Sequence, residues 1–323
     1  MAGCALCMVS GDIRSNFGII VQALADRTGV SYADVSFAVA VGQLMYGVTQ
    51  PVFGIVAMKK SNGFVLAMGT LMMAAGLLLT TLVRSAVVLV VTVGLLFFTG
   101  TGAVCFGIIM GAISPVLGER RASAASGILN ASSGIGGSLL SPLMQALQAS
   151  LGIGKLLVIL SVPVLVLLPI CLWVTRVSAA PVEGKREQID VLGRLKQALA
   201  DPDYRRLMIG FGTCGFHMCI IQTHIFSQIV SYGIAERTAS LAYTVFGLTT
   251  MAGSVLCGFL FGITFGGHQI GGFISSWLGG VFIAQSGNYQ AIWMFDIALC
   301  AIASAASYGI HRDVKRLSRA PER

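Results

Sequence analysis

Charge is scarce in this sequence. Only 11% of its 323 residues are Asp, Glu, Lys or Arg, whereas 55% are hydrophobic. Ordinary soluble domains carry about 25% charged residues, so a chain with so little charge cannot cover itself with a water-soluble surface. The composition therefore argues against a soluble enzyme. It predicts an all-α polytopic membrane protein built from hydrophobic helices.

Cysteines are absent from polar loops. All eight lie inside apolar stretches, where they are expected to be small buried side chains rather than disulfide partners. Cys4 and Cys7 have the spacing C-x-x-C, but an apolar surrounding lacks the accessible thiolate that redox or metal chemistry needs. We therefore predict no disulfide, no metal and no cofactor.

Acidic residues are fewer than basic ones, with 13 Asp and Glu against 21 Lys and Arg. The basic residues gather at the ends of apolar runs, where they determine membrane topology rather than bind nucleic acid. We therefore expect the protein to interact with the lipid bilayer and not with a nucleic acid. The sequence leaves the oligomeric state undetermined.

Long apolar runs fill most of the chain. About 20 apolar residues cross the hydrocarbon core of a bilayer, and ten runs of suitable length occur. They are 1–24, 33–57, 64–83, 86–112, 123–150, 154–175, 207–231, 238–262, 263–285 and 289–310. The first run lacks a preceding basic region and contains two charges, so we expect a spanning helix rather than a cleavable signal. The missing basic anchor also suggests a truncated or misassigned start.

One polar segment divides the spans into six and four. We predict a six-helix bundle at 1–175, a basic cytoplasmic loop at 176–206, a shortened four-helix bundle at 207–310 and a basic cytoplasmic tail at 311–323. A short amphipathic surface helix is expected within the loop, at 187–200.

Basic residues distribute unequally between the two sides of these spans. With the amino terminus inside, one side collects sixteen Lys and Arg, seven of them in the long loop. The other side collects Arg27, Arg84, Lys155 and Arg237. The positive-inside rule then places both termini and the long loop in the cytoplasm. The expected location is a bacterial inner membrane.

Several short motifs occur in an order that resembles the major facilitator superfamily, in particular its oxalate/formate antiporter-like and monocarboxylate-porter-like branch. They are Gly11-x-x-Arg14-x-x-Phe17-Gly18, Gln50-Pro51-x-x-Gly54, Arg120-Arg121-Ala122, Ser126-Gly127-x-x-Asn130, Cys214-Gly215-Phe216-His217, Thr223-His224 and Gly267-His268-Gln269-x-Gly271. The resemblance implies two bundles of six helices, a small organic anion as substrate, and Asn130, His268 and Gln269 among the residues of the translocation pathway.

The sequence departs from that family in three places. The loop after the second span, from Gly54 to Lys59 and Lys60, lacks the acidic residue of the family's gating motif. The span 238–262 contains no charged residue. The second half has four predicted spans, and we expect the equivalents of the ninth and tenth family helices to be missing at the break near Gly262. A competing interpretation makes 238–285 one re-entrant element.

Two charged residues lie inside the first span. A charge at the bilayer centre costs roughly 2.5–3.5 kcal/mol on insertion scales, which makes Asp12 and Arg14 candidates for function. Residues two apart on a helix point in different directions, whereas Asp12 and Asn16 share a face. We interpret Arg14 as an anchor for an anionic substrate and Asp12 as a proton carrier. The alternative is a buried polar network that fixes packing.

Histidines provide the second group of candidates. His217 and His224 are seven residues apart on one helical face, with Gln222 between them. They either line the pathway, pack in the interior, or hold a metal together with Cys214.

Three functions follow as hypotheses. A secondary transporter that binds its substrate between two rocking bundles fits best, with proton coupling and anion exchange both open. The alternative is an internally deleted, transport-inactive remnant. An intramembrane enzyme, with Ser254 or Cys214 as nucleophile and His268 or His224 as base, finds no supporting motif.

Overall fold

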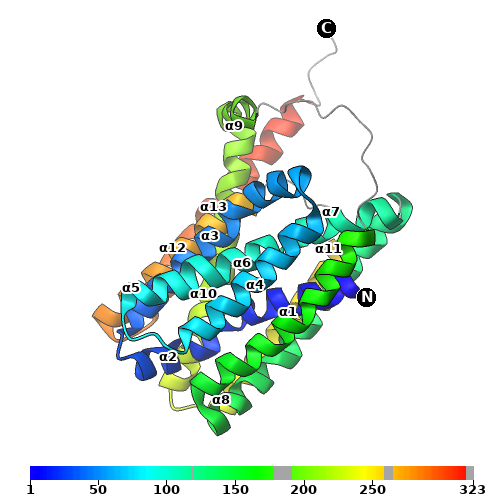
Figure 1. Ribbon diagram of the computed structural model, residues 1–323. Coiled ribbons are helices and arrows are strands. Elements are labelled where there is room, and N and C mark those ends of the chain that lie inside the picture. Colours follow the sequence, from blue (N-terminus) through cyan, green and yellow to red (C-terminus); the bar gives the residue numbers. More distant parts are fainter. Residues whose placement is uncertain (118, 178–190, 258–264, 318–323) are drawn as a thin grey trace.

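The computed structural model describes residues 1–117, 119–177, 191–257 and 265–317. It is 91% helical, and no strand occurs within these ranges. Figure 1 shows the long helices packed side by side in one bundle. The prediction of an all-α helical bundle is therefore confirmed.

The six expected spans of the first half all fall on helical segments. In chain order these are α1 (Ala2–Ser15), η1 (Phe17–Ile20), α2 (Val21–Thr28), α3 (Tyr32–Lys59), α4 (Asn62–Thr80), α5 (Ala86–Leu89), η2 (Val90–Phe97), α6 (Phe98–Ala103), α7 (Phe106–Leu117) and α8 (Glu119–Val177). The long α8 covers both the fifth and the sixth expected spans. Gly152 separates them, because its backbone angles, φ 76° and ψ 161°, are not helical. Glycine adopts this conformation without steric cost.

In the second half, helices cover the described parts of the four remaining apolar runs and of the expected surface helix. These are α9 (Val191–Ala200), α10 (Pro202–Ser231), α11 (Glu236–Cys257), α12 (Phe265–Ser286) and α13 (Gln290–Leu317). The expected junction of the eighth and ninth spans, 258–264, lies outside the described residues.

Serine residues cap the amino-terminal ends of several of these helices. The Oγ atoms of Ser31 and Ser61 accept hydrogen bonds from the backbone N–H groups of Asp34, at 3.1 Å, and Phe64, at 3.0 Å. A helix start leaves backbone N–H groups without partners, and a serine at the N-cap satisfies one of them. The short polar breaks between apolar runs thus mark the helix ends.

Membrane-spanning length and apolarity are clearest in the first half. Four described helical stretches meet both requirements, namely Tyr32–Lys59, Asn62–Thr80, Ala86–Ser114 and Ala125–Val174. A fifth is the pair Ala2–Ser15 and Phe17–Thr28, bent by 44°. The described parts of α10 to α13 do not meet both requirements, and in α13 the described apolar stretch Gln290–Ala305 is too short. In α10 the reason is a series of polar side chains that point inward, such as Thr223 and His224.

The bend in the first span is held by aromatic packing. The Phe17 ring lies 5.6 Å from that of Phe97 and 5.7 Å from that of Phe98, measured between centroids. All three side chains are buried. The bend after α1 is therefore anchored against the π-helical segment η2, of which Phe97 is the last residue.

Two pairs of helices make the most extensive contacts between the halves. α12 packs along α3, and α11 packs along α8. Glycines permit both close approaches: a Cβ atom on Gly280 would overlap Ser36 of α3, and one on Gly247 would overlap Ser138 of α8. Small residues at helix interfaces are typical of membrane proteins, where close backbone packing replaces the hydrophobic effect.

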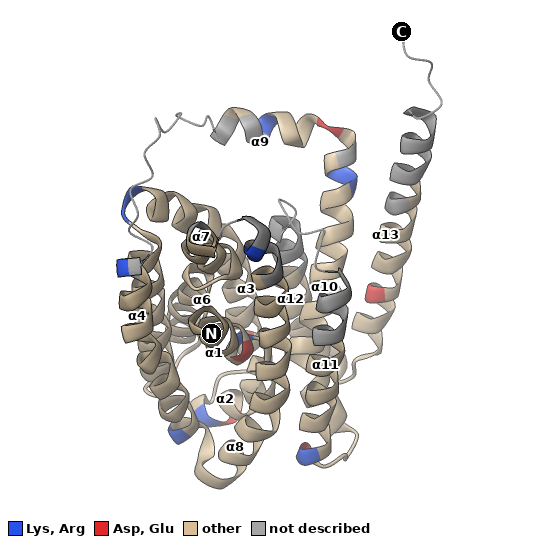
Figure 2. Ribbon diagram, turned by 90° about the vertical axis from the view of Figure 1, so that its right-hand side faces the viewer, with Lys and Arg blue, Asp and Glu red and all other residues tan. Residues whose placement is uncertain are grey.

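Charged residues concentrate at the ends of the bundle, as Figure 2 shows, and few lie between. α9 runs across one end, connected to the start of α10. This arrangement matches the surface helix expected at 187–200.

Candidate functional site

Arg14 lies in α1, at the middle of the first span. Its Nη1 donates a hydrogen bond to Oε1 of Gln43 in α3, at 2.8 Å. Its guanidinium carbon lies 4.4 Å from the centre of the Tyr46 ring, one helical turn further along α3. Both partners are uncharged, so the positive charge of Arg14 is solvated by an amide and an aromatic face.

No salt bridge joins Arg14 to a carboxylate among the described residues. Its Nε is buried and has no hydrogen-bond partner there, while the residue as a whole stays partly exposed. A buried donor without a partner is costly in free energy. The arrangement leaves the Nε donor of a mid-span guanidinium without a hydrogen-bond partner among the described residues.

Helices of both halves meet around this pair. A Cβ atom on Gly272 of α12 would lie 3.7 Å from Cβ of Gln43 and would crowd Sγ of Cys219 in α10. Gln43 itself is 1% exposed. The Arg14–Gln43 pair therefore lies where α1, α3, α10 and α12 come together.

Asp12 points to a different neighbour. Its Oδ1 accepts a hydrogen bond from Oγ of Ser133 in α8, at 3.1 Å, and its Oδ2 is buried without a partner in the described part of the chain. Asn16 donates from Nδ2 to the carbonyl oxygens of Asp12, at 2.9 Å, and Gly137, at 3.3 Å. Asp12 and Asn16 thus share the face toward α8, as the helical spacing indicates, and belong to a buried polar network.

His224 is enclosed. Its side chain is 1% exposed, Nδ1 lies 2.9 Å from the Tyr32 hydroxyl of α3, and Nε2 lies 3.2 Å from the Ser276 carbonyl oxygen of α12. Both ring nitrogens therefore have partners, and the side chain ties α10 to two other helices. The observation favours interior packing, and a pathway role for His224 stays a prediction.

His217 belongs to a separate cluster. Its Nδ1 lies 2.7 Å from Oδ2 of Asp296 in α13, and the exposed fractions of the two side chains are 47% and 6%. Cys300, one turn further along α13, brings its sulfur within 4.8 Å of the other two ligand atoms. The three side chains have the donor types of a metal site. Their carboxylate and thiol come from α13, whereas the metal site considered from the sequence used Cys214 of α10.

Two other predicted residues have local contacts. Asn130 donates from Nδ2 to the Ser126 carbonyl oxygen of its own helix, at 3.2 Å. Gln222 is buried, and its carbonyl oxygen accepts a hydrogen bond from the Tyr243 hydroxyl at 2.8 Å. The side chains of His268 and Gln269 lie outside the described part of the structure.

The residues of the expected gating loop lie at the carboxyl-terminal end of α3, on the surface of the bundle. Lys59 and Lys60 are exposed, and Nζ of Lys60 lies 4.8 Å from the centre of the Phe64 ring. A Cβ atom on Gly54 would have open space. Their role in gating stays a prediction.

The enzyme hypothesis loses one of its pairings. Cys214 and His224 are ten residues apart on α10, which separates them by roughly 15 Å along the helix axis. They cannot act as nucleophile and base on one substrate atom. The side chains of Ser254 and His268 lie outside the described residues.

Sequence reasoning missed Gln43, Tyr46 and Ser133. It selected charged residues, histidines, and amides that lie near them or within the family motifs, and these three residues belong to none of those groups. A signal was present, since Gln43 is an amide in the middle of an otherwise apolar run.

Comparison with known proteins supports one family. The sequence model of the Major Facilitator Superfamily matches residues 3–261. No curated protein matches the chain. The family match covers most of the sequence, and the helical membrane bundle agrees with it. The chain therefore belongs to the major facilitator superfamily of membrane transporters.

Proposed function

We propose that the chain transports a small carboxylate or other organic anion, with Arg14 as the anion contact. The observation that carries this proposal is the guanidinium of Arg14, placed mid-span with only neutral hydrogen-bond and ring partners among the described residues. Arginine binds carboxylates through two parallel N–H donors. A substrate carboxylate would pair the charge and also satisfy the free Nε.

The surroundings of Arg14 suit alternating access. Its neighbourhood combines α1 and α3 of the first half with α10 and α12 of the second. In this mechanism the two bundles rock about a substrate near the bilayer midplane. The glycine contacts Gly280–Ser36 and Gly247–Ser138 lie at the inter-bundle surfaces that would slide.

Coupling to protons is a second element of the proposal, beside anion exchange. The His217–Asp296 pair supports it, because Asp296 is buried and one of its carboxylate oxygens has no partner among the described residues. Intramembrane ionisable pairs commonly serve proton relays. Asp12 offers a second buried carboxylate, held by Ser133.

A shortened second half is the competing interpretation, and it predicts an impaired transporter. One observation supports the shortening. The family match ends at residue 261, next to the position where a helix pair is expected to be missing.

The re-entrant interpretation of 238–285 has less support. α11 and α12 are each 22 residues long. They pack against different helices of the first half, α8 and α3. Two separate spans account for these contacts better than one re-entrant element.

Uptake into proteoliposomes tests the proposal. Purified protein would be reconstituted and offered labelled formate, oxalate and lactate at two external pH values, with and without unlabelled anion inside. Concentrative uptake of at least one anion is expected. Stimulation by internal anion indicates exchange, and stimulation by an inward proton gradient indicates symport. Absence of uptake for the whole panel, by protein shown to be folded, would contradict the carboxylate assignment.

A second experiment separates an active transporter from a remnant. Two family-derived helices would be inserted after Gly262. If the shortened half impairs transport, the insertion raises uptake. Full transport by the unmodified chain, without a gain on insertion, would refute the impairment.

A further inference from the structure

The predicted topology places four basic residues on the non-cytoplasmic side, and three of them lie close together. Arg27, Arg84 and Lys155 line two adjoining hollows that share Arg27. One hollow, between α2 and the second part of α8, has a volume of about 510 Å³. The other has a volume of about 600 Å³ and includes Asp26. Arg237, on the same side, belongs to neither hollow.

The guanidinium of Arg27 is held in a fixed place. Its Nη2 donates a hydrogen bond to the Thr81 carbonyl oxygen at 2.8 Å. It also packs against Gly154, where an added Cβ atom would overlap it. The positive φ of Gly152 turns the chain just before this contact, which brings Lys155 to the start of the following helix.

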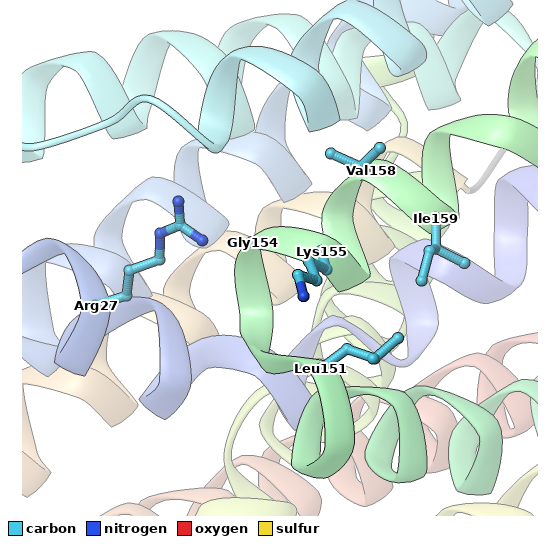
Figure 3. A pocket seen from close by; sticks show the side chains of 6 residues that line it. All are labelled: Arg27, Leu151, Gly154, Lys155, Val158 and Ile159. Carbon is cyan, nitrogen blue, oxygen red and sulfur yellow. The ribbon is translucent and has the colours of Figure 1, made fainter.

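Figure 3 shows the first hollow. Arg27 extends from α2 toward Gly154 of α8, and Lys155 is the next residue along α8. The rest of its lining is apolar, formed by Leu151, Val158 and Ile159. These three side chains are exposed on the bundle surface. The hollow therefore combines two cations at its rim with an apolar wall that runs along the helix.

We propose that this hollow binds an anionic phospholipid, with the phosphate between Arg27 and Lys155 and an acyl chain along Leu151, Val158 and Ile159. Arginine and lysine donate charge-assisted hydrogen bonds to phosphate groups, and the apolar wall is explained by a lipid but not by a free phosphate. The second hollow suits an anion less, because the Asp26 carboxylate lies in it.

Lipid-dependent stabilisation tests the site. Full-length protein in a neutral detergent would be titrated with phosphatidylglycerol, phosphatidylcholine or soluble glycerol phosphate while its unfolding temperature is recorded. Phosphatidylglycerol is expected to raise the unfolding temperature at concentrations where the other two do not. Arg27→Gln and Lys155→Gln should each weaken the apparent affinity for it about fivefold, as expected for the loss of one basic residue near a lipid headgroup.

Two further variants separate a built site from general charge attraction. Gly154→Ala keeps every charge but displaces the Arg27 guanidinium, so it should weaken binding as Arg27→Gln does. Arg237→Gln removes one charge on the same side outside the hollow and should leave the affinity unchanged. Equal losses for Arg237→Gln and Arg27→Gln, or an equal response to glycerol phosphate, would overturn the proposal. If Arg27→Gln does not fold, Lys155→Gln and Gly154→Ala decide the question.

Discussion

Nη1 of Arg14 donates a hydrogen bond to Oε1 of Gln43 across the α1–α3 contact, at 2.8 Å. The amide orients the guanidinium without neutralising it. A carboxylate at the place of Gln43 would form an ion pair with Arg14. The proposed role of Arg14 as an anion contact therefore depends on the neutral side chain at this position.

Substitution of Arg14 tests its role directly. Arg14→Lys keeps the charge but loses the paired donors, so we expect insertion to be preserved and KM for the anion to rise about tenfold, since a hydrogen bond to a charged group contributes about 1.5–3 kcal/mol. Arg14→Ala should abolish uptake. The measurement is initial uptake per inserted protein, with Arg237→Lys as control. Parental uptake by Arg14→Ala would remove Arg14 from the mechanism.

Gln43→Glu provides a complementary change. A carboxylate beside Arg14 would form an internal ion pair and compete with the substrate. Uptake by Gln43→Glu should therefore fall below that of Gln43→Met, which removes the hydrogen-bond acceptor without adding charge. Equal uptake by the two variants would show that the charge balance at Arg14 does not limit transport.

The His217–Asp296 pair is expected to carry the proton if transport is proton-coupled. Asp296→Asn should abolish accumulation driven by a pH gradient and retain exchange of labelled for unlabelled anion, because exchange needs no net proton movement. Both assays use the same vesicles. Cys300→Ala is the control for a metal role, since it removes one candidate ligand and leaves the pair intact. Gradient-driven uptake that survives Asp296→Asn would exclude the pair from coupling.

The close packing around Asp12 leads to a prediction about the thermal stability of two glycine variants. A Cβ atom on Gly136 would overlap the Asp12 carboxylate, whereas one on Gly127 of the same helix has open space. Overpacking of a filled interior costs about 1–3 kcal/mol. Gly136→Ala should therefore lower the unfolding temperature in detergent, and Gly127→Ala should leave it nearly unchanged. Equal unfolding temperatures for the two variants would contradict the close contact between Gly136 and Asp12.

Membrane orientation can be examined with reporter fusions. The long loop contains seven basic residues, which resist translocation across the membrane. A fusion of alkaline phosphatase near Lys185 should be inactive and a fluorescent protein at the same position should be fluorescent. An active phosphatase at Lys185 would reverse the predicted topology.

The sequence by itself determined the all-α membrane class of the protein and predicted where its apolar runs lie. Scarce charge and ten apolar runs leave helices as the practical way to satisfy the backbone within a bilayer. Breaks at Ser31, Ser61 and Gly152 are local signals, because N-caps and positive φ depend on residues close in the chain. The divergent directions of Asp12 and Arg14 also followed from helical periodicity alone.

Only the tertiary structure decided which side chains meet. Gln43 reaches Arg14 from another helix, and Asp296 reaches His217 from 79 residues away. Such partners depend on how helices pack and rotate about their axes, which a span's apolar composition leaves open: when nearly every position is apolar, periodicity no longer identifies a buried face. For the same reason His217 and His224, although seven residues apart on one helix, have separate partners on different helices.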